Sequence, residues 1–483
     1  MLLPACPQGP TTYPLWKMLP EKYLQVGTNP KYEFGIDQSE QDSLNMNIFV
    51  PLSALEKGAE PVPVMTWVHG GAFRNGANGV PLYDARNFVA HSAQLHRPVI
   101  VVTINYRVGV FGFFASKELQ QEMDELVRNS TTPIPLYDQS IGNWGGNERD
   151  VTAWGESAGS FSLHYHMLIP SHFGLFDHAI MQSGVVGTMP AQTVELEGQV
   201  MFDKLLETLN ISADLDALEK ASETAFPITA YGPFHDGGKF MPSDMPTQTL
   251  STFPSSYDPN IKSIMIGATR DEGSAFGLGF GEPKVAAAYP GIVEKFAPDP
   301  KLVPLFQSVY GIPETDADVF KLLNESIGDM IFHYPIEQIV DTLVQLQMER
   351  GGPKKFSLIR YHYNVELFKM RELFPELKAM HAGELPIIFG PPLSELALNE
   401  DELRLSLEIQ KRWIAFAHQQ PVVAEEAGRV ANAEKDEAIV WTEDYRVEVG
   451  KGRRLSKEAQ VFWDNVTNFK LQKIQQDLDR RGQ

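Results

Sequence analysis

Six short apolar segments, each rich in β-branched residues, limit what this chain can fold into. Runs of this length that are hydrophobic on both faces are typical of strands buried inside a parallel sheet. Parallel neighbours cannot be joined by tight turns, so helices must cross between them and cover the sheet. The pattern predicts an α/β fold with a mostly parallel central sheet and helices on both faces. The segments are residues 62–68, 98–105, 151–154, 179–182, 261–267 and 356–363.

Two longer stretches have the spacing of amphipathic helices. In residues 117–128 (KELQQEMDELVR) four apolar side chains share one helical face, and residues 457–479 place Phe462, Val466 and Phe469 at helical spacing. We find no internal repeat, low-complexity tract or linker that would divide the 483 residues. The sequence therefore predicts one α/β domain over residues 1–483, a size that large α/β enzymes reach.

Charge and composition exclude several classes of function. A net charge of -21 argues against binding to nucleic acid or anionic membranes, which select clustered Lys and Arg. No apolar run approaches the ~20 residues that span a bilayer, and the start, MLLPACPQGP, lacks the basic region of a signal peptide. Cys6 is the only cysteine, which fits a reducing compartment, so we expect a cytoplasmic protein. His164 and His166 have no Cys or carboxylate at ligand spacing, so no metal site is expected.

The stretch DVTAWGESAGSF, residues 150–161, contains the pattern G-x-S-x-G with Ser157 at its centre. The pattern alone is weak, because it also arises by composition. Its context is stronger, since a strand (151–154) precedes it and a helical stretch from Ser160 follows. A sharp strand-to-helix turn exposes the central serine above the sheet, and Gly155 and Gly159 allow the close approach. Ser157 is therefore the candidate nucleophile; a glycine turn without chemistry is the alternative.

A serine hydroxyl needs a base, and the base needs an acid that orients it. In the α/β-hydrolase layout the chain order is nucleophile, acid, base. Four histidines lie C-terminal to residues 271–272, the segment that offers the candidate acid. His333 and His418 fall on helical patterns and His362 lies within a predicted strand, whereas His381, in AMHAGELP, follows that strand in a loop of small residues. We therefore choose His381 as the base.

The acid should follow a strand at the same edge of the sheet. The segment IKSIMIGATRDEGS ends a predicted strand in Asp271-Glu272, and physical reasoning alone does not choose between the two carboxylates. A tetrahedral intermediate also needs hydrogen-bond donors for its oxyanion. The strand 62–68 runs into the small-residue loop HGGAF, so we propose the backbone N–H groups of Gly71, Ala72 and Ala158 as those donors.

Seven segments together resemble the type-B carboxylesterase and lipase family, which also holds the cholinesterases. They are QDSLNMNIFVP, WVHGGAF, INYRVGVFGFF, VTAWGESAG, AIMQSG, GATRDEGS and HAGELPIIFG. The resemblance implies the α/β-hydrolase fold as one domain without a cofactor. Carried over residue by residue, it implies Ser157 as nucleophile, Glu272 rather than Asp271 as acid, and His381 as base. It also supports Gly71, Ala72 and Ala158 as the oxyanion hole.

The chain departs from this family's pattern in several places. Members carry a further N-terminal segment before the CPQ motif, and the usual disulfide partner of Cys6 is replaced by Ser43. Gln41 stands where members usually have a glutamate. Between NWG and GNERD, about 20 residues are missing that normally form the helix crossing to the nucleophile strand. We therefore expect a truncated N-terminus and a shortened link into that strand.

The resemblance implies hydrolysis of small-molecule carboxylic esters through a Ser-His-Glu triad and an acyl-enzyme intermediate. Alternatives are a triacylglycerol lipase or an amidase of the same fold, and a member that has lost catalysis. An intact set of three candidate residues argues against the last alternative. The segment containing Trp16, PLWKMLP, does not match the context of the family's choline site, so cholinesterase specificity is not expected.

Overall fold

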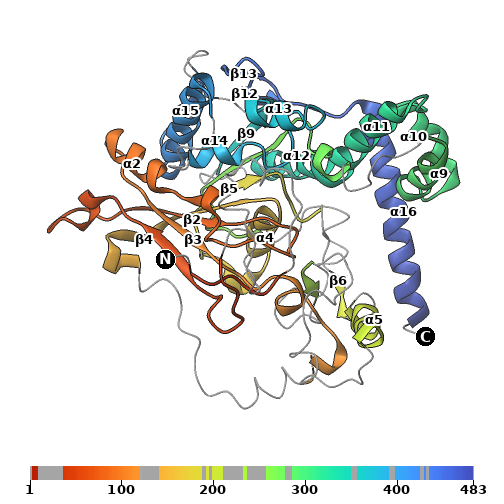
Figure 1. Cartoon of the computed structure of the whole chain (residues 1–483), viewed down its shortest axis with the longest axis horizontal. Coiled ribbons are helices and arrows are strands. Elements are labelled where there is room, and N and C mark those ends of the chain that lie inside the picture. Colours follow the sequence, from red (N-terminus) through yellow and green to blue (C-terminus); the bar gives the residue numbers. More distant parts are fainter. Residues whose placement is uncertain are drawn as a thin grey trace.

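The fold centres on one large sheet in the computed structural model of the chain (Figure 1). The structure describes residues 3–8, 36–119, 121, 141–187, 192–194, 198–209, 232–235, 257–277, 285–349, 356–390, 398–424, 429–430 and 435–481. The sheet has nine strands in the order β1-β3-β2-β4-β5-β8-β9-β12-β13. Neighbours from β3 to β12 run parallel, and the edge strands β1 and β13 are antiparallel to theirs. The predicted mostly parallel sheet is confirmed.

All six predicted strands are present, and five of them have at least one shifted end. The strands are β1 (Met46–Phe49), β2 (Val62–Val68), β3 (Ile100–Ile104), β4 (Gly146–Glu156), β5 (His178–Gln182), β8 (Ser263–Thr269), β9 (Ser357–Tyr363), β12 (Glu437–Trp441) and β13 (Val447–Lys451). Strand β4 extends past its apolar run because Gly155 and Glu156 still pair with Met181 and Gln182 of β5. Strands β1, β12 and β13 escaped prediction. The edge strands β1 and β13 are only half covered and lack a continuous apolar run, whereas β12 was missed although its residues 438–441 are apolar and buried.

Helices fill the connections between the strands. They are α2 (Arg86–Gln94), α4 (Ala158–His166), α5 (Gln199–Leu209), α8 (Ser274–Gly277), α9 (Val285–Phe296), α10 (Val303–Tyr310), α11 (Asp316–Gly328), α12 (Tyr334–Glu349), α13 (Phe368–Leu373), α14 (Leu385–Phe389), α15 (Glu400–Ala417) and α16 (Lys457–Arg481). Two-stranded pairs join β6 (Gln192–Thr193) to β7 (Phe234–His235) and β10 (Val423–Ala424) to β11 (Arg429–Val430). The predicted C-terminal helix is confirmed; residues 117–119 and 121 are helical, and the rest of the predicted helix 117–128 lies outside the described residues.

Each face of the sheet has its own apolar core, because side chains alternate along a strand. On one face Trp67 and Trp154 pack edge to face at 4.8 Å, and Trp154 stacks on Phe389 of α14 at 4.7 Å. This core includes residues of α2 and α15, which lie with α14 at the upper left of Figure 1. On the other face Ala153 belongs to a core that includes Leu163 of α4 and other residues of α4 and α12. Helices thus cover both faces, as predicted.

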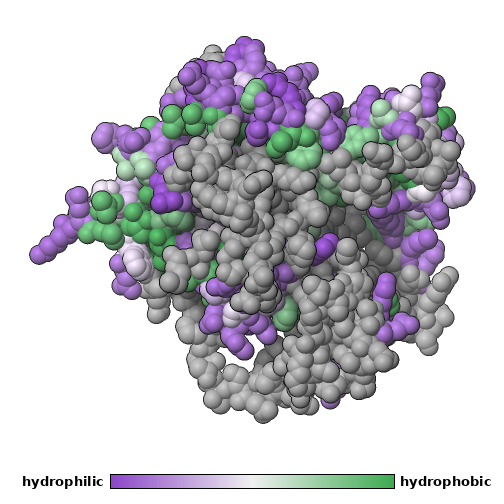
Figure 2. Space-filling model, in the orientation of Figure 1, coloured by the Kyte–Doolittle hydropathy of each residue, from purple (hydrophilic) through white to green (hydrophobic). Residues whose placement is uncertain are grey.

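One end of the sheet is more thinly covered. There Met46 and Val151 are only partly buried, against a small core that includes residues of the short helical turns η2 (Leu52–Leu55) and η6 (Ile141–Trp144). Leu52 is 83% exposed and Trp144 46%. Figure 2 shows hydrophobic residues gathered at the left of the view, toward β2–β4, whereas hydrophilic residues cover the top. At this end the described part of β4 enters the sheet at Gly146.

Candidate active site

Ser157 stands at a sharp turn between β4 and α4. Its backbone has φ 54° and ψ -123°, in the region that L-residues rarely adopt, and the helix begins at the next residue, Ala158. The Ser157 N–H donates to the carbonyl of Gln182 on β5 at 2.9 Å, which ties the turn to the sheet. Because α4 begins directly after Ser157, the positive end of the helix dipole points at the serine. This is the strand–turn–helix geometry that the sequence predicts.

Two glycines make this turn possible. A Cβ on Gly155 would lie 2.7 Å from the carbonyl carbon of Gly159, and a Cβ on Gly159 would lie 2.0 Å from the carbonyl oxygen of Val68. Real side chains do not approach backbone atoms so closely, so larger residues at either position would push α4 away from the sheet. The close approach of α4 to the sheet that the G-x-S-x-G motif predicts is therefore present.

Glu272 lies three residues beyond the end of β8 and is fully buried. Its Oε1 accepts hydrogen bonds from the Thr269 N–H at 2.7 Å and from the Ser183 hydroxyl at 2.6 Å. Its Oε2 lies 2.5 Å from Nδ1 of His381. The carboxylate is thus fixed by two donors on one oxygen and by the imidazole on the other.

Asp271, the other carboxylate that the sequence left open, points elsewhere. Its Oδ2 accepts from Arg270 Nε at 2.7 Å and from the Ala379 N–H at 3.2 Å. The Asp271 N–H donates to the Ala379 carbonyl at 2.9 Å, and Asp271 forms an isolated parallel bridge with Met380. Asp271 therefore links the loop after β8 to the loop after β9 by hydrogen bonds. Because these loops carry Glu272 and His381, the link places the two residues next to each other.

The His381 ring is buried between carboxylates and aromatic rings. Its Nδ1 faces Glu272, and its Nε2 lies 3.0 Å from Oε1 of Glu156, the residue immediately before Ser157. Phe332 and Phe276 pack against the ring at centroid distances of 4.5 and 5.3 Å. The Nε2 edge thus faces the turn that carries Ser157.

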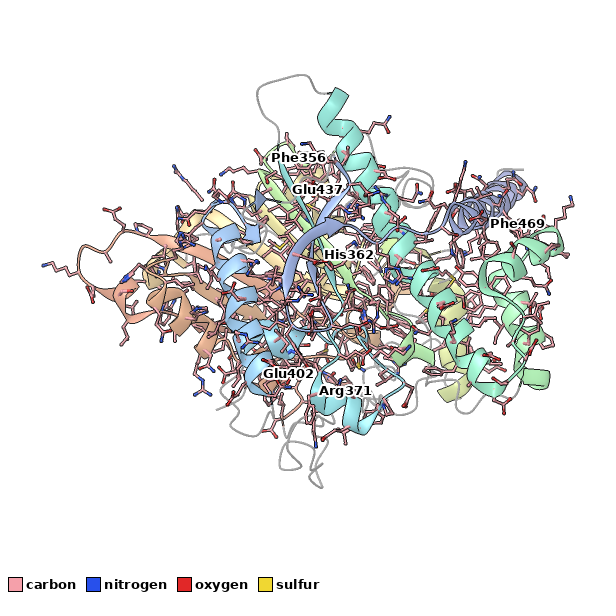
Figure 3. The ribbon with its side chains drawn as sticks, turned by 90° about the horizontal axis from the view of Figure 1, so that it is seen from above. Phe356, His362, Arg371, Glu402, Glu437 and Phe469 are labelled. Atoms are coloured by element: carbon pink, nitrogen blue, oxygen red, sulfur yellow. The ribbon has the colours of Figure 1, made fainter. Side chains whose placement is uncertain are left out.

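The other three histidines have different partners. His333 Nε2 lies 2.9 Å from Arg453 Nη1, and His362 Nε2 accepts the Arg453 N–H at 2.9 Å. Figure 3 shows His362 within the sheet, on β9. Burial, together with Arg453, lowers the pKa of both imidazoles. His418 directly follows α15, and its Nε2 lies 3.2 Å from the Pro98 carbonyl. Among these histidines, the structure brings only His381 to Glu272.

The loop after β2 has an unusual backbone. Gly71, Ala72 and Phe73 have φ of 114°, 55° and 58°, and the left-handed conformation costs about 1–3 kcal/mol at each non-glycine residue. A Cβ on the preceding Gly70 would lie 3.0 Å from the Ser157 Cβ, so this loop lies against the serine. The N–H groups of Gly71, Ala72 and Ala158 donate to no acceptor within the described ranges. These three donors are therefore free to bind an anionic oxygen.

Sequence reasoning missed three polar residues around His381. Glu156 and Glu384 are 3% and 1% exposed, and Ser183 binds Glu272. Glu384 Oε1 accepts from Gln182 Nε2 at 2.9 Å. Burial raises the pKa of Glu156, and burial with the nearby carboxylates raises that of Glu384 to about 8. The sequence indicates only that two of these residues lie near the site, since Glu156 occupies the variable position of G-x-S-x-G and Glu384 follows His381 by three residues; it does not indicate their contacts.

Replacing Glu156 by glutamine should move the pH dependence of this site. Burial lowers the pKa of His381, but Glu156 and then Glu272 raise it by more, to about 10. Only the neutral imidazole can act as a base, so ester turnover should rise as the pH passes upward through that pKa. Without the Glu156 charge the pKa falls, and we expect the acid limb of kcat/KM to move down by about one pH unit or more. Glu366→Gln, which removes a partner of Arg270, is the control; an unmoved acid limb in Glu156→Gln would refute this assignment.

Two further properties concern the whole described structure. No group of three or more His, Cys, Asp or Glu that could hold a metal ion occurs among the residues described. His164 and His166 both lie on α4, and the buried His164 accepts the Val186 N–H at 3.1 Å. None of the described helices is both long and apolar enough to cross a membrane.

Comparisons with known proteins identify the family of this chain. The family model described as "Carboxylesterase family" matches residues 3–443. The chain is 27% identical to a para-nitrobenzyl esterase of Bacillus subtilis, over 79% of this chain and 75% of the relative. It is 26% identical to an acylcarnitine hydrolase of Mus musculus (96% and 80% covered) and 25% identical to a liver carboxylesterase of Sus scrofa (91% and 79%). The chain belongs to the carboxylesterase family, whose α/β-hydrolase fold it has, and this membership supports carboxylic-ester hydrolysis as its class of activity.

Proposed function

We propose that this protein is a serine carboxylic-ester hydrolase in which Ser157 is the nucleophile, His381 the general base and Glu272 the acid that orients it. One observation carries the proposal: the buried Glu272–His381 pair, 2.5 Å apart, faces the strained turn on which Ser157 stands. The carboxylate on Nδ1 leaves Nε2 as the nitrogen that can accept a proton. Gly71, Ala72 and Ala158 supply the oxyanion hole.

The reaction follows from these positions. As Ser157 Oγ attacks the ester carbonyl carbon, its proton passes to Nε2 of His381, and the carbonyl oxygen becomes an oxyanion that the three backbone N–H groups stabilise. The C–O bond to the alcohol then breaks, and the alcohol leaves with the proton from His381. Water attacks the acyl-enzyme in the same way, giving its proton to His381, and the carboxylic acid departs as the proton returns to Ser157. Glu272 stays ionised and stabilises the imidazolium that forms in each half.

The residues around the serine favour apolar parts of a small-molecule ester. Phe73, Phe161 and Phe332 are almost fully buried in one cluster with Ala158, the residue after the nucleophile. Phe276 packs against both Phe332, at 5.7 Å, and His381. Aromatic side chains stabilise bound apolar groups by burial and offset stacking.

Covalent labelling tests the proposal without knowledge of the substrate. We expect a fluorophosphonate probe to add once to the wild type, as read by intact mass, and not to Ser157→Ala. The control is Ser162→Ala, because Ser162 lies on α4 and its hydroxyl donates to the Ala158 carbonyl at 2.8 Å. This variant should label like the wild type. A folded wild type that takes no label would overturn the proposed function and favour a member without catalysis.

A further inference from the structure

The strained loop 70–76 has to be held at several points to keep its conformation. Three consecutive residues, Gly71 to Phe73, have positive φ, and two of them carry side chains. Such a backbone persists only where its surroundings fix it. The Arg74 and Asn75 N–H groups close the turn on the Gly71 carbonyl, at 3.0 and 3.2 Å.

The beginning and middle of the loop are held by the segment after β3. The Tyr106 hydroxyl donates to the His69 carbonyl at 2.8 Å, and the two rings stack at 4.3 Å. The Gly109 N–H donates to the Phe73 carbonyl at 2.7 Å. These contacts leave the far end, at Gly76, to be fixed from elsewhere.

That end is held by one side-chain amide from the N-terminal segment. Gln8 Oε1 accepts the Gly76 N–H at 2.6 Å, and Gln8 Nε2 donates to the Gly76 carbonyl at 3.0 Å and to the Cys6 carbonyl at 2.9 Å. Gln8 is 5% exposed, so both backbone groups of Gly76 are paired away from bulk water. Gly76 itself has φ 115°, and a Cβ there would lie 2.3 Å from His69 Nδ1.

The side chain required here is narrowly defined. It needs one acceptor and one donor in a plane, at the distance from the backbone that glutamine provides. Glutamate lacks the donor, and asparagine is one methylene shorter. The Gln8 backbone also contacts the Gln38 side chain, whose amide accepts the Gln8 N–H at 3.0 Å and donates to the Gln8 carbonyl at 3.1 Å.

We propose that Gln8 is a positioning residue for catalysis: by pairing both backbone groups of Gly76 it keeps the N–H groups of Gly71 and Ala72 aimed at the oxyanion. Gln8 does not touch the substrate. The inference rests on the proposed function, because it assigns these N–H groups the role described above. It gives the N-terminal segment a part in the chemistry of a site built from the loops after β2, β4, β8 and β9.

The test compares Gln8→Ala with Gln38→Ala, measuring kcat and KM for a p-nitrophenyl ester per active site titrated with a phosphonate. Removing one oxyanion donor lowers kcat by about 10²–10³-fold. A displacement of two donors, the N–H groups of Gly71 and Ala72, should therefore lower kcat by at least about tenfold. KM and the acid limb of the pH profile should not change, because the triad is untouched. Gln38→Ala removes two hydrogen bonds to the Gln8 backbone but leaves the Gln8 amide on Gly76. The backbone hydrogen bonds of Ala5 with Asp37 and Ser39 still hold the segment, so kcat per active site should stay within about twofold of wild type.

The possible outcomes separate the two proposals. A Gln8→Ala variant with fewer titratable sites but unchanged kcat per site would show that Gln8 only supports folding, and would overturn the inference. Equal loss of kcat in both variants would overturn it too, because the position of the whole segment would then matter rather than the amide. If the wild type neither hydrolyses the ester nor takes the phosphonate, the proposed function fails, and this inference fails with it. A trifluoromethyl ketone forms a hemiketal when Ser157 Oγ adds to its carbonyl carbon and His381 takes the serine proton, which places the oxyanion in the hole. Its affinity for Gln8→Ala should therefore fall by the same factor as kcat/KM.

Discussion

Ser157→Ala should lower ester hydrolysis by about a millionfold, to the background that bound water and the oxyanion hole supply. A loss of this size corresponds to about 8 kcal/mol of transition-state stabilisation. The physical reason is that, under the proposed mechanism, the Ser157 hydroxyl is the nucleophile, and alanine leaves no atom to form the acyl-enzyme. The measurement is kcat/KM on an activated ester, with the thermal unfolding midpoint recorded for each variant.

The folded structure should survive this substitution. Alanine at position 157 has the same backbone strain as serine, and no capping hydrogen bond from the Ser157 side chain is present at the start of α4. We therefore expect an unfolding midpoint close to that of wild type. Ser162→Ala is again the matched control and should keep nearly full activity. Turnover by Ser157→Ala above one thousandth of wild type would exclude Ser157 as the nucleophile.

His381→Gln should cause a loss of similar size, because nucleophile and base act as one unit. Glutamine roughly keeps the volume and can still donate to Glu272, but an amide cannot take the proton from Ser157. We expect both turnover and fluorophosphonate labelling to fall, since both require an activated hydroxyl. Single-turnover kinetics would show that acylation is the step affected.

The control for this variant is His418→Gln, at the end of α15. His418 lies outside the loops that carry the three candidates, and its ring contacts the Pro98 carbonyl. Its replacement should leave kcat unchanged. If His381→Gln retained normal turnover, the base would have to be another residue, and the Glu272–His381 contact would be structural only.

Six of the nine strands of the central sheet could be predicted from the sequence, because buried parallel strands leave a continuous apolar signature; the buried strand β12 was missed together with the two edge strands. The segment 62–68 matches β2 at both ends. Edge strands have no such signature: β1 (MNIF) is half-buried throughout, so its pattern resembles that of a loop. Strand β8 begins and ends two residues later than predicted, because pairing with β9 continues to Thr269 opposite Tyr363.

The candidate site could be predicted as positions in the chain but not as contacts. Local reasoning placed His381 in a loop, yet it could not choose between Asp271 and Glu272. That choice depends on the bridge between Asp271 and Met380, which joins residues more than a hundred positions apart. The contact of Glu156 with His381 is likewise a product of tertiary structure, and no spacing rule indicates it.

The length of β4 separates the connection that precedes it from the candidate site. The strand runs from Gly146, where the link arrives, to Glu156, so its two ends lie on the order of 30 Å apart at ~3.3 Å per residue. A change in this connection would act on the end of the strand that carries none of the proposed catalytic residues, so we expect its cost to fall on the free energy of folding. Substitutions at this junction should then change how much folded protein accumulates, whereas turnover per folded molecule should stay the same. Abundance and catalytic power would then evolve along separate routes in this protein.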